Sequence, residues 1–207
     1  MEKRKYSVMV FDLGNVLIPF NYNLVIERFN NASPGLGNKF VEYFKANYDV
    51  HRKFERGDMP EGEFINLMLT VLENKISKEK FLNDYSKIFS VNEKVASLLP
   101  VLKEKFVLVL LSNTNSIHRE YGWKDYEFLK YFDKLILSYE ANAVKPEEKI
   151  YKAVEAFTNK PSGEHLFIDD IAEYVEGAKK AGWDSVRFTG YEKLVSDLTE
   201  REILNYN

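Results

Sequence analysis

The chain has 207 residues, and its 29 lysine and arginine residues against 32 aspartate and glutamate residues give a formal net charge of −3. A protein that binds nucleic acid through its overall field carries a strong basic excess, so we expect no nucleic-acid partner. Because the sequence contains no cysteine, disulfide scaffolds, thiolate metal sites and thiol nucleophiles are excluded.

The amino-terminal residues 1–11 are basic and then apolar, but the apolar run ends at Asp12 and is too short for a signal peptide. The longest apolar run, Phe106 to Leu111, is far below the ~20 residues that span a bilayer. We therefore expect a cytoplasmic protein with no membrane partner. The sequence carries no signal for an oligomeric state.

The first predicted strand, Ser7–Phe11, is followed by a segment with helical patterns and no convincing strand, residues 20–89. Breakers such as Ser33-Pro34-Gly35 divide this segment. Its predicted helices are Leu24–Phe29, Lys39–Phe54, Glu61–Leu72 and Lys78–Phe89. Its aromatic residues recur at roughly helical spacing, which favours a core of its own over a set of stacking platforms. They are Tyr22, Phe29, Phe40, Tyr43, Phe44, Tyr48 and Phe54.

The rest of the chain alternates short apolar runs with helical patterns, which predicts parallel βαβ units. The further predicted strands are Phe106–Leu111, Lys134–Leu137, His165–Ile168 and Ser185–Phe188. One helix is predicted to begin with Pro146 at its first position, and another to end before Gly182. The sequence therefore predicts an α/β domain, residues 1–19 plus 90–207, with an all-helical domain, residues 20–89, inserted in it.

Polar residues follow three of the predicted strands. Asp12 follows the first, Ser112-Asn113-Thr114-Asn115 the second, and Asp169-Asp170 the fourth. Ligands of open parallel sheets bind outside the carboxyl ends of the strands, so one site is predicted there. Carboxylates without imidazole or thiolate suit a hard cation such as Mg²⁺ together with a phosphate oxygen. The three histidines, His51, His118 and His165, are too dispersed in the sequence to indicate a metal site.

Four segments in order carry a family resemblance. They are Phe11-Asp12-Leu13-Gly14-Asn15-Val16-Leu17, Leu111-Ser112-Asn113-Thr114-Asn115, Lys145-Pro146 and Phe167-Ile168-Asp169-Asp170. Together they resemble the ordered motifs of the haloacid dehalogenase (HAD) superfamily. The resemblance implies a Rossmann-like parallel sheet, with the helical insertion as a cap domain. Residues 54–58 of the insertion, Phe-Glu-Arg-Gly-Asp, resemble the branch of sugar-phosphate phosphatases such as α-D-glucose-1-phosphate phosphatase.

The resemblance also implies roles for individual residues in a Mg²⁺-dependent phosphatase of a small phosphorylated metabolite. Asp12 would be the nucleophile that forms an aspartyl-phosphate, while Lys145 and Ser112 would hold the transferring phosphoryl group. Substrate-binding positions would be Asn15 and Asn113 of the core and His51, Glu55 and Arg56 of the cap. Mg²⁺ would be bound by Asp12, the carbonyl of Gly14, Asp170 and, directly or through a second layer, Asp169.

The sequence departs from the family pattern in places. Many family phosphatases carry an acid–base aspartate where Gly14 stands, so the proton must come from water or a cap residue such as Glu55 or His51. Ile171 and Tyr174 replace polar residues, which weakens the expected support of the metal ligands. Asn142 stands where glycine is common, and asparagine tolerates the left-handed backbone.

Simpler interpretations of the same residues stay open. Ser112-Asn113 could cap the next helix, Asp170 could cap the helix near Ala172, and Lys145 could be a solvated residue at a helix entrance. Two other functions also remain: a 2-haloacid dehalogenase, against which the acidic pair argues because that reaction needs no metal, and a binding or regulatory protein that has lost turnover.

Overall fold

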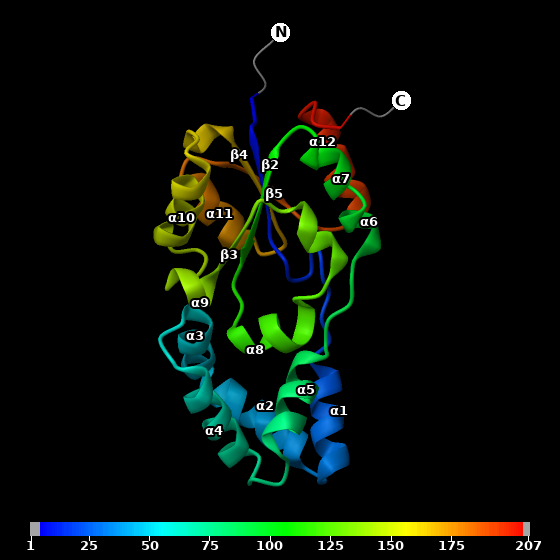
Figure 1. Ribbon diagram of the computed structural model, residues 1–207, viewed down its shortest axis with the longest axis vertical. Coiled ribbons are helices and arrows are strands. Elements are labelled where there is room, and N and C mark those ends of the chain that lie inside the picture. The colour runs from blue at the N-terminus through cyan, green and yellow to red at the C-terminus, as the bar shows by residue number, and fades with distance from the viewer. Residues whose placement is uncertain (1–4, 205–207) are drawn as a thin grey trace.

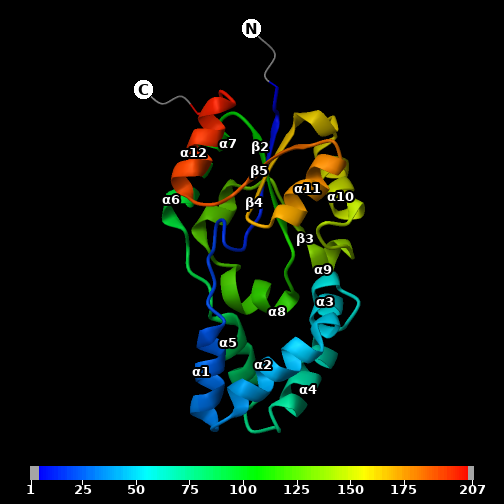
Figure 2. The same cartoon turned by 180° about the vertical axis from the view of Figure 1, so that it is seen from behind.

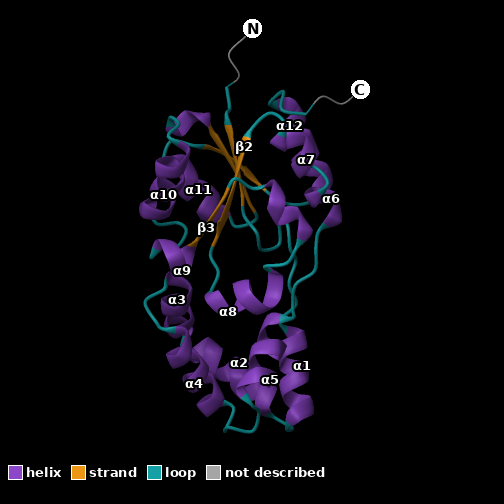
Figure 3. Ribbon diagram, viewed as in Figure 1, coloured by secondary structure: helices purple, strands orange, loops and turns teal. Residues whose placement is uncertain are grey.

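The computed structural model describes residues 5–204. Its centre is a parallel five-stranded sheet in the order β3-β2-β1-β4-β5 (Figures 1 and 3). The strands are β1 Val8–Phe11, β2 Val107–Ser112, β3 Lys134–Leu137, β4 His165–Asp169 and β5 Asp184–Arg187. All five predicted strands are present within one residue of their expected ends. The predicted class, an α/β fold with a Rossmann-like parallel sheet, is confirmed.

The strand sequences are continuous apolar runs because helices cover both faces of the sheet. Met9 and Phe11 pack on one face, against a layer that includes α6 Glu93–Ala96, α7 Leu99–Lys103 and α12 Tyr191–Glu200. Val8 and Val10 pack on the other, where α10 Glu148–Thr158 and α11 Ala172–Lys180 lie. The two opposite views show these helices on either side of the sheet (Figures 1 and 2).

The insertion is helical throughout and has its own core. Its helices are α1 Asn23–Ala32, α2 Leu36–Ala46, α3 Tyr48–Arg56, α4 Glu61–Val71 and α5 Lys78–Ser86. Phe29, Phe40 and Phe54 are buried in this core, as expected from their spacing. The two chain segments that join the insertion to the sheet domain pair at an antiparallel bridge between Phe20 and Phe89. The insertion lies beyond the carboxyl ends of the strands, opposite the described ends of the chain (Figure 1).

The single helix predicted over Lys39–Phe54 is wrong, because the chain breaks at Asn47. Asn47 ends α2 and precedes α3 with non-helical dihedral angles, φ −130° and ψ 45°. Its side-chain amide donates to the carbonyl oxygen of Tyr43 at 3.0 Å. Asparagine competes for backbone hydrogen bonds in this way, and the break turns α3 toward the sheet domain.

Shorter elements lie in the segments between the strands of the sheet domain. They are α8 Ser116–His118, a π-helical turn Arg119–Trp123, a 3₁₀ turn Glu127–Tyr131, α9 Ser138–Ala141 and a 3₁₀ turn Ser162–Glu164. Asn142 follows α9 with φ 48°, the left-handed conformation expected for it. Within residues 5–204, no helix is long and apolar enough to cross a membrane.

The predicted start of α10 is corrected. The helix begins at Glu148, and Pro146 lies in the preceding turn, where the backbone N–H of Glu147 donates to the carbonyl of Val144. This turn forms because Lys145 is held by the neighbouring loop, as described below. The predicted end of α11 is confirmed, with Gly182 at φ +88° after the last turn.

Candidate active site

The carboxyl ends of β1, β2 and β4 bring the polar residues of three motifs together. Phe11 lies opposite Leu110 of β2 and Ile168 of β4, so Asp12, Ser112 and Asp169 follow at neighbouring strand ends. The strand order reverses across β1, which is where open α/β sheets bind their ligands. Helix α3 of the insertion lies close to this edge, next to α9 (Figure 1).

Lys145 joins two of these strand ends. Its Nζ atom lies 2.6 Å from Asp12 Oδ1 and 2.6 Å from Asp169 Oδ2. Lys145 is only 1% exposed. The alternative of a solvated lysine at a helix entrance is therefore wrong: the ammonium group is buried because two carboxylates compensate its charge.

The cluster has more negative than positive charge. Carboxylate oxygens of Asp12, Asp169 and Asp170 all lie within 4.8 Å of one another, against the single ammonium group of Lys145. Burial and the two neighbouring carboxylates outweigh Lys145 and raise the pKa of Asp12 to about 7. Burial also raises the pKa of Asp170. A bound cation would favour the ionised form of both groups.

The possible metal ligands of the cluster are carboxylate oxygens of Asp12, Asp169 and Asp170, which suit a small hard cation. Asp169 uses both oxygens within the protein, since Oδ2 accepts from Lys145 and Oδ1 accepts from the backbone N–H of Ile171 at 2.8 Å. Asp170 accepts a hydrogen bond from Asn15 Nδ2 at 3.2 Å, and Asp12 Oδ1 accepts from Lys145. Asp170 does not cap α11, because the N-cap position is occupied by Ile171.

The loop after β2 positions Lys145. Asn113 Oδ1 accepts from the backbone N–H of Lys145 at 2.8 Å, and Asn113 Nδ2 donates to the Lys145 carbonyl at 3.1 Å. The Tyr174 hydroxyl also accepts from Asn113 Nδ2, at 3.2 Å. Tyr174 thus supplies a phenol hydroxyl at a position where the family pattern has a polar side chain. Neither Ser112 nor Asn113 caps α8, because the capping side chain is that of Asn115.

A cavity of about 270 Å³ extends from this cluster to the insertion. Asp12, Gly14, Asn15, Ser112, Asn113, Lys145 and Asp170 line its core side, and His51 and Glu55 its insertion side. The predicted position Arg56 is not among the lining residues. It forms ion pairs with Glu147 and Asp58 instead.

The cavity is also lined by residues that were not predicted from the sequence to belong to the site. Arg52 lines it and donates from Nη2 to the Lys145 carbonyl at 2.7 Å. Tyr22, Phe44 and Tyr48 contribute aromatic walls, so these aromatic residues are not only core. His118 lines the same cavity as His51, although the two residues are far apart in the sequence. The four-residue spacing of His51 and Glu55 was a usable signal, whereas nothing in the sequence indicated His118.

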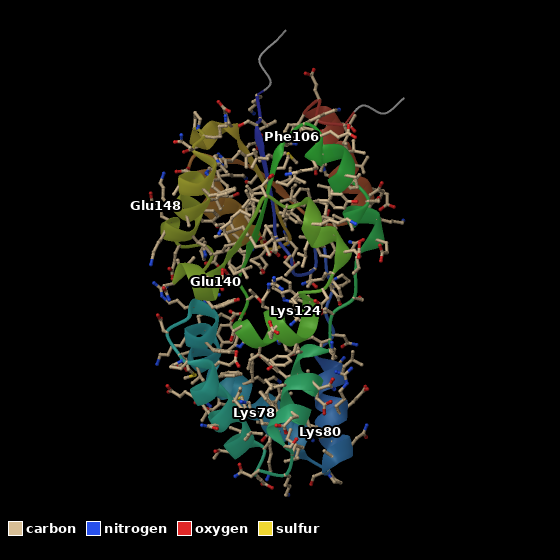
Figure 4. All side chains as sticks on the ribbon, in the orientation of Figure 1. Lys78, Lys80, Phe106, Lys124, Glu140 and Glu148 are labelled. Atoms are coloured by element: carbon tan, nitrogen blue, oxygen red, sulfur yellow. The ribbon has the colours of Figure 1, made fainter. Side chains whose placement is uncertain are left out.

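Direct contacts seat α3 on the site loops. Ser138 Oγ lies 2.6 Å from the Glu55 carbonyl and accepts from the backbone N–H of Thr114 at 2.9 Å. A Cβ atom on Gly57 would lie 2.3 Å from the Tyr139 carbonyl oxygen, so the two backbones approach closely. Figure 4 shows side chains between the sheet and the insertion and labels Glu140 on α9, the helix that lies next to α3.

A buried carboxylate and lysine cluster at the switch point of a parallel sheet, with a helical insertion above it, defines a class of α/β hydrolases. The model of the haloacid dehalogenase-like hydrolase family matches residues 6–182. The chain belongs to this family and is a hydrolase, as the resemblance of its motifs implied.

Two curated relatives are similar over most of their length. One, a phosphorylated carbohydrates phosphatase of Thermotoga maritima, is 25% identical over 87% of this chain and 83% of its own. The other, a D-ribitol-5-phosphate phosphatase of Bacteroides thetaiotaomicron, is 22% identical over 86% of this chain and 89% of its own.

Solved structures agree with the fold. A HAD family enzyme of Bacteroides thetaiotaomicron, in complex with magnesium, has a TM-score of 0.78 and 27% identity over 89% of this chain and 94% of its own. L-2-haloacid dehalogenase of Xanthobacter autotrophicus has a TM-score of 0.61 and 21% identity over 96% of this chain and 84% of its own, a likeness of fold alone.

Proposed function

We propose that the protein is a Mg²⁺-dependent phosphatase that hydrolyses a small phosphorylated carbohydrate through an aspartyl-phosphate intermediate. The observation that carries this proposal is the cluster in which Lys145 contacts Asp12 and Asp169 while Asp170 lies beside them. The two phosphatases among the relatives support the substrate class.

The reaction takes two steps at Asp12. A carboxylate oxygen of Asp12 attacks phosphorus, the bond from phosphorus to the leaving oxygen breaks, and an alcohol is released when that oxygen gains a proton. Water then attacks the aspartyl-phosphate, returning the carboxylate and releasing phosphate. Lys145 holds Asp12 in place and compensates charge on the phosphoryl oxygens, and Ser112 supplies a hydroxyl beside them.

Asp12, Asp170 and the Gly14 carbonyl would hold Mg²⁺, with Asp169 acting through Lys145 and the Ile171 backbone. When bound, the ion neutralises charge on the phosphoryl group and orients it. Ile171 lacks a polar side chain, but its backbone N–H donates to Asp169, so this part of the support is supplied by the main chain.

The cap role of the insertion belongs to the same proposal. The contacts of Arg52 with Lys145 and of Glu55 with Ser138 join residues 20–89 to the site loops. A seated cap excludes water from the site, and its side chains select the leaving group.

The first test is hydrolysis of p-nitrophenyl phosphate with and without Mg²⁺, followed by a panel of sugar and polyol phosphates. We expect activity that depends on Mg²⁺ and is lost in Asp12→Asn, with a sugar or polyol phosphate as the preferred substrate. Dehalogenation of a 2-haloacid without metal would contradict the proposal. Binding of phosphate or beryllium fluoride without turnover would identify a binding protein instead.

A further inference from the structure

The proposed reaction needs a proton for the leaving oxygen, and the core does not supply one from the usual place. Gly14 stands two residues after Asp12 and has no side chain, so it cannot transfer a proton. Lys145 is engaged by two carboxylates, which outweigh its burial and raise its pKa above the ordinary value. Apart from water, a proton donor must therefore come from another wall of the cavity.

Most titratable groups of the insertion side are unsuited to this task. Burial raises the pKa values of Tyr22 and Tyr48. Burial and the charge of His51 lower the pKa of His118 to about 3, which leaves its imidazole neutral. Burial works against the ionised form of Glu55, but its hydrogen bond and charge interactions with His51 leave its pKa below the ordinary value.

His51 has the geometry of an oriented acid. Its Nε2 atom lies 3.1 Å from Glu55 Oε1, one helical turn further along α3. Its Nδ1 atom is buried and has no hydrogen-bond partner among the described residues. His51 is 6% exposed, and both His51 and Glu55 line the cavity that contains Asp12. The carboxylate therefore fixes the orientation of the ring, and the other nitrogen remains available.

Helix α3, which carries this pair, contacts the loops around the reacting end of the cavity. Arg52, the next residue after His51, donates to the carbonyl oxygen of Lys145 at 2.7 Å. The carbonyl of Glu55 contacts Ser138, whose hydroxyl also accepts from Thr114 in the loop after β2. Phe44 and Tyr48 lie beside the His51 ring at centroid distances of 4.5 and 6.0 Å, and the buried, neutral His118 is close enough for the charge of His51 to act on it.

We propose that His51, oriented by Glu55, is the general acid and base of this enzyme, a catalytic role that the cap provides in place of a core aspartate. This proposal rests on the proposed phosphatase function. As the bond from phosphorus to the leaving oxygen breaks, that oxygen takes the proton of His51 Nδ1, and the ring keeps its Nε2 proton toward Glu55. In the second step, neutral Nδ1 accepts a proton from the attacking water, which restores the cation. Glu55 is a positioning residue in this scheme.

The decisive comparison uses leaving groups that differ in their need for a proton. p-Nitrophenolate leaves without protonation, whereas the alkoxide of a polyol phosphate such as D-ribitol 5-phosphate does not. We expect His51→Gln to lower kcat for the polyol phosphate about 10²- to 10⁴-fold and to change that for p-nitrophenyl phosphate less than about fivefold. The pH dependence of kcat for the polyol phosphate that arises from His51 in the wild type should be missing in this variant.

Two further variants complete the test. His165→Gln changes a buried histidine that stacks on Trp183 at the amino end of β4, the opposite end of the strand from Asp169, and it should leave the ratio of the two rates unchanged. Glu55→Gln should lower the polyol phosphate rate less than His51→Gln does while leaving the p-nitrophenyl phosphate rate nearly unchanged, and it serves alone if His51→Gln does not fold. Equal losses on both substrates, or no loss on either, would overturn the role of His51 while the phosphatase function stands. A wild type inactive on both substrates would overturn the phosphatase function and, with it, this proposal.

Discussion

The ammonium group of Lys145 lies 2.6 Å from the carboxylate of Asp12, although the two residues are 133 positions apart in the chain. The contact is buried, and Asp169 accepts from the same ammonium group. Because a buried charge needs its partners, this relationship fixes the distance between β1 and the loop before α10. It also places a positive charge beside the proposed nucleophile.

Lys145→Met should abolish phosphatase activity and destabilise the fold. Removing one partner of a buried ion pair leaves uncompensated carboxylates and costs about 3–5 kcal/mol in the free energy of unfolding. Urea unfolding and hydrolysis of p-nitrophenyl phosphate measure the two effects. Lys179→Met removes a lysine from an exposed pair with Glu176 and should change neither by a measurable amount. An active Lys145→Met variant would contradict the assignment of Lys145.

Gly57→Ala should disturb the seating of the insertion. Gly57 has φ +84°, and a Cβ atom there would lie 2.3 Å from the Tyr139 carbonyl oxygen. We expect a loss of roughly 1–3 kcal/mol in the free energy of unfolding and a lower kcat/KM, since α3 can no longer approach the core. Gly62→Ala is the matched control, because nothing lies within 4 Å of its added Cβ. It should stabilise α4 by about 0.5 kcal/mol and leave kcat/KM unchanged.

The sequence predicts that Arg56 faces the substrate, whereas in the structure Arg52 lines the cavity. Arg52 lines the cavity and contacts the Lys145 carbonyl, whereas Arg56 pairs with Glu147 outside the cavity. Arg52→Met should lower kcat/KM about 10- to 100-fold, because a hydrogen bond from a charged donor is lost at the site. Arg56→Met should lower it only a few-fold. The reverse order would show that Arg56 faces the substrate.

The contribution of His118 to stability should fall as the pH falls below about 6.5, whereas Asp12, whose pKa is raised to about 7, contributes in the opposite direction. Burial lowers the pKa of His118 to about 3 in the folded protein, so the unfolded chain takes up a proton first. This contribution is fully present above pH 6.5 and falls by about 1.4 kcal/mol per pH unit below it, until the folded pKa is reached. Burial also lowers the pKa of His165, which adds in the same direction.

Urea unfolding between pH 7.5 and 5 measures this effect. His118→Phe keeps a ring stacked on Tyr85 and removes the titrating group, so as the pH falls its free energy of unfolding should fall less, or rise more, than that of the wild type. An identical slope in the two proteins would contradict the neutral, buried state of His118. Asp184, whose pKa is about 2 despite its partial burial because Tyr6, Arg201 and Lys5 contact it, loses its contribution only at lower pH.

The strands and the core half of the site could be predicted because their signals are local. An apolar run that ends in a polar residue indicates both a buried strand and the edge where its last side chain lies, as Phe11 followed by Asp12 shows. Parallel pairing then brings Asp12 and Asp169 together whatever the details of the helices.

The insertion was harder to predict because its side chains depend on helix ends and helix phase. The break at Asn47 lies within an unbroken helical pattern and sets the direction of α3. That direction puts Arg52 rather than Arg56 in the cavity. His118 and His51 line the same cavity from separate helices, and no spacing in the sequence encodes this placement.

The most direct test of the central claim is mass spectrometry of the enzyme quenched in acid during turnover with Mg²⁺ and substrate. We expect the mass of one phosphoryl group on the peptide that contains Asp12, and no such species in Asp12→Asn. Turnover that proceeds with the phosphoryl group on another residue, or that survives in Asp12→Asn, would contradict the account.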